Sequence, residues 1–314
     1  MRDGSARGSE TLWALLLSAL LSVPALASGS PARAQERLSI VTTTNDLRSL
    51  AEAVGGERVA VTALVPPGLD PEEYQPRPQD LTRVRQARAV VRVGLDFDLW
   101  LDRLLAQVGA SVRRGADGYV DASLGIATLD VRGMSIGDGH GHGSGNPHYW
   151  LDPRNAEIIT ANILAALVGI DPESTAIYEA NRAAFLARLE PKLKEWEDRL
   201  AALRGVPLVA YHNSWPYFAR RFRLEFIGTV EPKPGVPPSP AHLASLIGTM
   251  NARAARIIVR QPHEPEKDVA FVAKRTGSVV AVLASSVAAL PGAIDYLSLF
   301  DSNVAALRAA AGVR

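Results

Sequence analysis

Short apolar runs rich in β-branched residues alternate with longer segments of helical periodicity over most of the chain. This pattern predicts seven strands, at Leu38–Thr43, Val59–Val65, Ala89–Val93, Pro207–Tyr211, Leu224–Gly228, Arg256–Arg260 and Ser278–Leu283. We expect helices in most of the gaps, because strands that alternate with helices are typical of parallel sheets covered by helices. The predicted fold class is therefore α/β, with mainly parallel sheets flanked by helices.

The segment from Ser174 to Leu203 has apolar residues at helical spacing among many charges, and Gly205 follows as a stop signal. We expect one long helix, kinked or interrupted at Pro191 because proline removes a hydrogen bond and clashes with the preceding turn. Since strands alternate with helices on both sides of this helix, it is expected to connect two lobes. The predicted division is an N-terminal lobe, a connecting helix and a C-terminal lobe over residues 35–172, 173–205 and 206–314.

The first 34 residues have a different character from the rest of the chain. Arg2 and Arg7 precede an apolar run of about 16 residues that ends at Ala27. That run is shorter than the roughly 20 residues that a membrane-spanning helix needs. We therefore interpret residues 1–34 as a secretory signal peptide, cleaved near Ala27 or Ala34, rather than as an uncleaved anchor. The expected location is the periplasm.

Composition narrows the range of possible functions further. With 314 residues and 47% hydrophobic residues, the chain is long enough to build two lobes with a sizeable core. Lys and Arg number 34 against 33 Asp and Glu, so no basic surplus exists to attract nucleic acid. The absence of cysteine excludes disulfides, thiolate metal sites and a lipid-modified cysteine. We expect a soluble monomer.

Candidate binding residues lie in four loops that follow predicted strands or open helices. Ligands of open α/β sheets bind outside the carboxyl ends of the strands, so side chains from distant loops can converge between two lobes. In isolation each residue also has an ordinary structural role, such as a surface acid or a helix N-cap. The loops are Pro66–Pro76 with Glu72 and Glu73, Asn146–Pro153 with His148, Tyr211–Trp215 with His212, and Asp295 with Tyr296.

These loops belong to a series of ordered motifs that covers nearly all of the chain after the signal segment. The motifs are Pro67–Pro71, Pro147–Pro153, His212–Trp215, Tyr217–Phe222, Glu231 with Pro232, Pro238–Leu243, and Tyr296 with Asn303. In this order and spacing, the chain resembles the zinc/manganese-type solute-binding proteins of ABC importers, also called cluster A-I or the TroA-like superfamily. The family's fold consists of two α/β lobes joined by a long helix.

The resemblance implies one buried metal ion between the lobes, with one ligand from each of the four loops. By position these ligands are Glu72, His148, His212 and Asp295. The family usually has histidine where this chain has Glu72, and its last acid usually lies nine residues before the final asparagine. Asp295 lies eight residues before Asn303, which leaves Asp301 as the alternative ligand.

Two imidazoles and two carboxylates neutralise a divalent cation and suit zinc, manganese or ferrous iron. Zinc is the first choice and manganese or iron the alternative. Either Glu72 binds the metal directly and broadens selectivity, or it only lines the cleft and Glu73 or a water completes the coordination. His242 and His263 are expected to be non-ligands.

The expected function is to capture the metal in the periplasm and to deliver it to the permease of an ABC importer. A periplasmic metallochaperone is a further candidate partner. One alternative is a stand-alone metal buffer or chaperone. A metallohydrolase is disfavoured, because the chain has no His-Glu-x-x-His helix, Gly-x-Ser-x-Gly elbow or phosphate loop.

The stretch Gly137–Gly145 is rich in glycine and contains His140 and His142. It is expected to form a mobile loop. Its histidines are either incidental to a solvated linker or gather metal weakly.

Overall fold

The structure is a computed structural model that describes residues 36–129 and 145–313. The chain divides into two compact units, Met1–Gln35 and Glu36–Arg314, and only the second contains described residues. The expected signal peptide and the stretch with His140 and His142 lie outside the described residues. No helix in the described part of the chain is long and apolar enough to cross a membrane.

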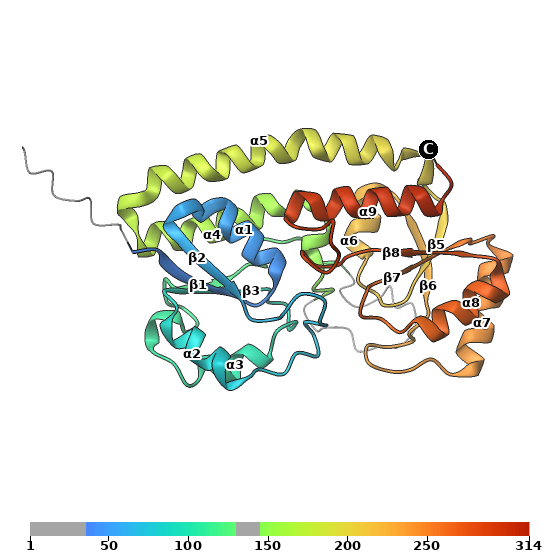
Figure 1. Cartoon of the computed structure of the whole chain (residues 1–314), viewed down its shortest axis with the longest axis horizontal. Helices are drawn as coiled ribbons and strands as arrows, with labels where there is room; N and C mark the ends of the chain where they lie inside the picture. Colours follow the sequence, from blue (N-terminus) through green and yellow to red (C-terminus); the bar gives the residue numbers. More distant parts are fainter. Residues whose placement is uncertain (1–35, 130–144, 314) are drawn as a thin grey trace, which may run out of the picture. The chain divides into compact units, whose positions relative to one another are not determined.

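The described chain contains two parallel sheets of four strands each, one in each predicted lobe (Figure 1). The strand orders are β2-β1-β3-β4 and β6-β5-β7-β8. The strands are β1 Leu38–Thr42, β2 Val59–Ala63, β3 Ala89–Arg92, β4 Tyr119–Asp121, β5 Pro207–Ala210, β6 Glu225–Thr229, β7 Ile257–Arg260 and β8 Val279–Val282. Strand β4 was not predicted, because its three residues are too few to show periodicity; it pairs with β3 at the edge of the first sheet.

Helices cover both faces of each sheet. They are α1 Asn45–Gly55, α2 Pro78–Gln86, α3 Trp100–Leu105, α4 Ala156–Ile170, α5 Thr175–Arg199, α6 Pro216–Phe222, α7 Pro240–Ala252, α8 Glu266–Thr276 and α9 Tyr296–Ala310. Alternate residues of a strand point to opposite faces. Ile40 and Val91 therefore join the core under α1, α4 and α5, whereas Val41 and Val90 join a second core under α2 and α3. The predicted α/β class with two parallel sheets is confirmed.

The predicted connecting helix is α5, which packs against α1 and α4 at one end and against α9 and α6 at the other (Figure 1). The predicted interruption at Pro191 does not occur, since α5 continues through this residue. Burial of Leu189, Leu193 and Trp196 on either side of Pro191 offsets the lost backbone hydrogen bond. The helix therefore gives both lobes one continuous support.

Hydrogen bonds also join the two lobes close to the ends of the strands. The Asp46 carboxylate at the start of α1 accepts the Val287 N–H at 2.9 Å and the Ser286 hydroxyl at 2.7 Å. The Trp150 indole N–H donates to the Ser285 carbonyl at 2.8 Å. Since these groups are buried, the bonds hold the carboxyl ends of the two sheets against each other.

Candidate metal centre

A cavity of about 360 Å³ lies where the carboxyl ends of the strands of both sheets meet. Loops that follow strands of both sheets supply its walls, as the rule for open α/β sheets predicts. The polar residues from these loops include Glu72, His212, Ser214, Glu231, Gln261, Glu264 and Ser285, and His148 comes from the segment before α4.

Glu72 is held in place by its own loop between β2 and α2. The Glu72 N–H donates to the Asp70 carboxylate at 2.8 Å, and the Trp100 indole N–H donates to the Pro71 carbonyl at 3.0 Å. Gly68 has a φ of +77°, which glycine adopts without strain, and so the chain can turn back here. The Glu72 side chain is only 16% exposed and lines the cavity.

His148 lies on a rigid segment that precedes α4. Both its backbone N–H and its ring Nδ1 face the Asn146 side-chain oxygen, at 3.0 and 3.2 Å. The ring packs against Phe97 and Trp150, with centroid distances of 5.5 and 5.3 Å. This packing directs the Nε2 atom toward Glu72, whose Oε1 atom lies 3.1 Å away.

His212 follows β5, and its ring lies between two carboxylates. Its Nδ1 donates to the Glu231 Oε2 atom at 2.5 Å, and its Nε2 lies 3.6 Å from the Glu72 Oε1 atom. Glu231 follows the neighbouring strand β6, where its backbone N–H donates to the Tyr211 carbonyl at 2.9 Å. Strand pairing therefore brings Glu231 beside His212.

The charge state of His212 depends on these carboxylates. Burial of the ring lowers its pKa, but hydrogen bonds and charge interactions with Glu231 and Glu72 outweigh burial and raise the pKa from 6.5 to about 10. In the absence of a cation, the imidazolium thus offsets one of the two carboxylate charges. A metal ion that binds Nε2 must displace this proton, because only the unprotonated nitrogen is a ligand.

The donor atoms of Glu72, His148 and His212 all lie within 4.8 Å of one another. In a tetrahedral zinc site with bonds of about 2.0–2.1 Å, neighbouring ligand atoms are about 3.3 Å apart. The distances of 3.1 and 3.6 Å from Glu72 to the two histidines are close to that value. The arrangement therefore fits one divalent cation.

Asp295 does not belong to this cluster. Its carboxylate accepts the Ser298 N–H at 2.7 Å and its own N–H donates to the Ser298 hydroxyl at 2.8 Å, which makes a capping box at the start of α9. Asp295 is also absent from the residues that line the cavity. The structure thus does not bring Asp295 to the cluster, because its carboxylate caps α9, and its role as fourth ligand stays a prediction.

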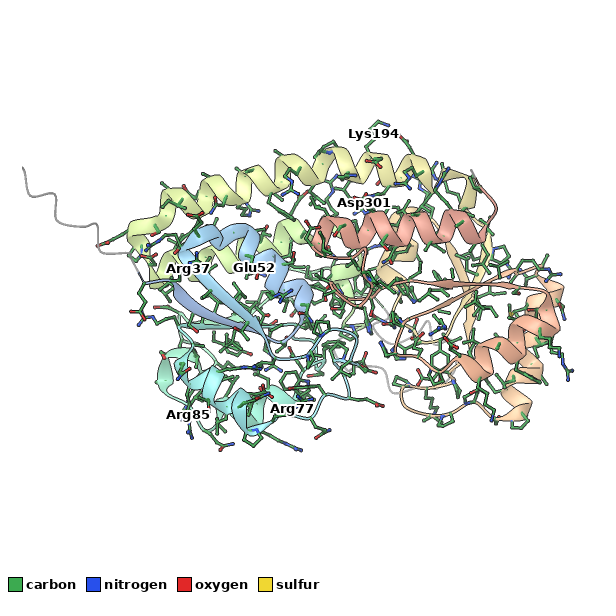
Figure 2. The ribbon with its side chains drawn as sticks, viewed as in Figure 1. Arg37, Glu52, Arg77, Arg85, Lys194 and Asp301 are labelled. Carbon is green, nitrogen blue, oxygen red and sulfur yellow. The ribbon has the colours of Figure 1, made fainter. Side chains whose placement is uncertain are left out.

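The alternative ligand, Asp301, also lies elsewhere. It is on α9 (Figure 2). Its carboxylate accepts from the Lys192 ammonium at 3.0 Å and from the Trp196 indole N–H at 2.8 Å, both on α5. Asp301 thus helps to fix α9 to the connecting helix. Neither acid near the C-terminal end of the chain reaches the two histidines in the structure.

Replacement of Asp295 by alanine is consequently expected to leave metal affinity within about twofold of the wild type. Loss of the cap should lower the free energy of unfolding by about 1 kcal/mol. Chelator competition and urea denaturation measure the two effects, and Asp301→Ala serves as the comparison. A hundredfold loss of affinity in Asp295→Ala alone would restore Asp295 as a ligand.

Two histidines expected to be non-ligands lie outside the cluster. The His242 Nε2 atom hydrogen-bonds to the Thr229 carbonyl at 2.9 Å. His263 lines the cavity, but it is not in the cluster; its Nε2 atom lies 4.0 Å from Asp70, and burial lowers its pKa.

Sequence reasoning missed the role of Glu231 and a buried polar network beside the cavity. Gln261 donates to Ser214 at 2.8 Å and to Glu264 at 2.9 Å, and burial raises the pKa of Glu264 to about 7. A usable signal existed for Glu231, since it follows a predicted strand as His212 does. In the sequence it stands only within the motif of Glu231 and Pro232.

Comparison with known proteins identifies the family of the chain. The family model described as zinc-uptake complex component A, periplasmic, matches residues 40–310. The chain is similar to a putative metal-binding protein of Treponema pallidum (strain Nichols), with 29% identity over 253 residues, 78% of each chain. It is 23% identical over 266 residues to the iron-binding protein YfeA of Yersinia pestis, covering 83% of this chain and 81% of YfeA.

The crystal structure of ZnuA superposes with a TM-score of 0.76 and 29% identity, covering 88% of this chain and 99% of that one. Two α/β lobes joined by a long helix are the fold of periplasmic substrate-binding proteins of metal ABC importers. Such proteins work with a membrane permease and an ATPase. The chain belongs to the family of periplasmic zinc-uptake complex component A.

Proposed function

We propose that the protein captures one divalent transition-metal ion, zinc in the first place, with Glu72, His148 and His212 and delivers it to the permease of its importer. The supporting observation is that three donor atoms, from loops of both lobes, lie within 4.8 Å of one another. Elemental analysis of protein purified without chelators tests this proposal. One ion per chain is expected, and a protein that takes up no stoichiometric ion would contradict it.

Zinc is the proposed metal because two imidazole nitrogens and one carboxylate oxygen form a mixed ligand set that zinc prefers. Zinc also binds such sites more tightly than manganese or ferrous iron. The family description names zinc, whereas the similar Yersinia pestis protein is named for iron. Manganese or iron is therefore the alternative cargo.

A water is proposed to complete the coordination, since the described residues offer three donors at the cluster. An open position is also a feature of catalytic zinc, which needs a general base nearby. The buried acids around the cavity have other partners: Glu231 accepts from His212, and Glu264 accepts from the Gln261 side chain and backbone. We therefore propose binding and transport without catalysis.

Replacement of Glu72 by histidine is expected to shift the metal preference toward zinc over manganese. Imidazole is a softer donor than carboxylate, and the change removes one negative charge from the cluster. Competition titrations of both metals against the same chelator measure the ratio of affinities. An unchanged ratio, together with full zinc binding by Glu72→Ala, would show that Glu72 only lines the cavity.

The protein is further proposed to reach the periplasm through a signal peptide cleaved near Ala27 or Ala34 and to act there as a monomer. Binding proteins of this family are exported, and the apolar run before Ala27 is too short for a membrane anchor. A periplasmic metallochaperone remains a proposed partner. The intact mass of the periplasmic protein identifies the cleavage site, and an uncleaved mass would contradict this proposal.

A further inference from the structure

Glu231 is the buried carboxylate most closely tied to a proposed metal ligand. Its side chain is only 10% exposed, and each oxygen has a partner. Oε2 accepts from the His212 ring at 2.5 Å, and Oε1 accepts the Gly235 N–H at 2.8 Å. The Thr229 hydroxyl donates to the Glu231 carbonyl at 2.7 Å, which fixes the backbone. The carboxylate is thus held on both sides.

This contact selects the tautomer of His212. A carboxylate only accepts hydrogen bonds, so the proton must lie on Nδ1 and the lone pair of the neutral ring on Nε2. Nε2 is the atom that faces Glu72 and the other histidine in the cluster. An anionic partner on the far nitrogen also makes an imidazole ligand more basic.

The two histidines of the cluster differ in the charge of the group that faces their Nδ1 atom. The His148 Nδ1 atom faces the neutral amide oxygen of Asn146 at 3.2 Å, whereas the His212 Nδ1 atom faces a carboxylate. With Asp295 used at the end of α9, Glu72 is the sole carboxylate among the three clustered donors. Glu231 adds a second negative charge directly behind the ring of His212.

Glu231 also connects His212 to the hairpin formed by residues 232–238. Lys233 and Val236 pair in this hairpin, whose tip at Gly235 has a φ of +70°. A Cβ atom at Gly235 would lie 3.1 Å from the Glu73 carboxylate, so the hairpin approaches the loop that contains Glu72. The same hairpin lines the cavity.

We propose that Glu231 is a positioning residue for the cargo metal: it holds His212 in the metal-binding tautomer and supplies from behind the ring the second negative charge that offsets the cation. This inference rests on the proposed function, since it needs His212 to bind the metal. Glu231 does not itself coordinate the ion. Its effect on the metal passes through the imidazole.

Two substitutions of Glu231 separate the effect of its hydrogen bond to His212 from the effect of its negative charge. Glu231→Gln keeps an oxygen that accepts from Nδ1 but removes the charge, whereas Glu231→Ala removes both. We expect zinc affinity to fall about tenfold in Glu231→Gln and up to about 100-fold in Glu231→Ala, the range typical of such supporting groups. Glu225→Gln is the matched control, because Glu225 begins the strand that Glu231 follows but pairs with Arg253 at the surface. The control should retain wild-type affinity.

Binding of Co²⁺, followed by its visible absorption, shows whether the coordination changes. Glu231→Gln should keep the intensity of the wild-type Co²⁺ spectrum, because the ligand atoms stay the same, while its affinity falls. Wild-type affinity in both Glu231 variants would overturn the inference. So would a change in Co²⁺ coordination, which would make Glu231 a ligand.

The experiments on the Glu231 variants and the test of the proposed function can be interpreted separately. If the wild type binds one ion and loses it in His212→Ala, the site is established whatever the Glu231 variants do. Unchanged affinity of the Glu231 variants then contradicts the positioning role alone. Thermal unfolding of the metal-free variants checks that they fold, and Glu231→Asp provides a conservative rescue that should restore part of the affinity.

Discussion

Replacement of His212 by alanine is expected to weaken zinc binding at least about 100-fold. Zinc sites with four protein ligands are worth about 10–16 kcal/mol, so one ligand contributes about 3 kcal/mol. His212 is also the donor from the second sheet, and its loss leaves Glu72 and His148, both from the first lobe. The variant should therefore lose the contact that ties the ion to both lobes.

Isothermal titration or chelator competition with zinc measures this loss, and elemental analysis gives the stoichiometry. His242→Ala is the control, since His242 is a histidine of the same lobe whose Nε2 atom binds the Thr229 carbonyl. It should bind one ion with wild-type affinity. If His212→Ala also holds one ion at wild-type affinity, the assignment of the metal site is wrong.

Replacement of Asp98 by alanine is expected to lower the free energy of unfolding by about 3–5 kcal/mol. Asp98 is fully buried and its carboxylate lies 3.0 Å from the guanidinium of Arg92, which is 3% exposed. The same carboxylate accepts the Val93 N–H at 2.7 Å and the Gly94 N–H at 3.2 Å. Alanine would leave the buried Arg92 guanidinium without the buried carboxylate that offsets its charge. It would also leave the Val93 and Gly94 N–H groups without this acceptor.

The effect should extend to the metal centre. The turn that Asp98 stabilises contains Leu95 and Asp96 at φ values of 50° and 62°, a region that such residues rarely adopt. This turn places the Phe97 ring 5.5 Å from the ring of His148. Loss of Asp98 is thus expected to loosen the support of His148, one of the proposed ligands, as well as the fold.

Urea denaturation of the metal-free protein measures the change in stability. Asp102→Ala is the matched control: its carboxylate binds the same guanidinium at 2.6 Å, but the side chain is 52% exposed. An ion pair with an exposed partner contributes less to stability than a buried one. The free energy of unfolding of this variant should therefore fall by no more than about 1 kcal/mol. Equal losses in the two variants would show that burial of Asp98 does not make the difference.

Local patterns determined much of this protein. Runs of β-branched residues predicted the strands of both sheets, because a buried parallel strand must be apolar on both faces. The same patterns placed Glu72 and His212 in loops after strands and His148 at a helix entrance. The structure brings these three residues together. Their proximity was predictable from the rule that ligands of open α/β sheets bind outside the carboxyl ends of the strands.

Only the tertiary structure decided which acids face the cavity. Asp295 stands before a helix, where an aspartate that caps and an aspartate that binds metal have the same local sequence. The position of each acid relative to the other strands decides between these roles. Glu231 lies beside His212, whereas the Asp295 carboxylate accepts the Ser298 N–H. Likewise, Pro191 breaks an isolated helix, but α5 packs on both lobes and continues. Short-range patterns determine elements and loop positions, whereas contacts between residues distant in the chain determine which side chains remain for the metal.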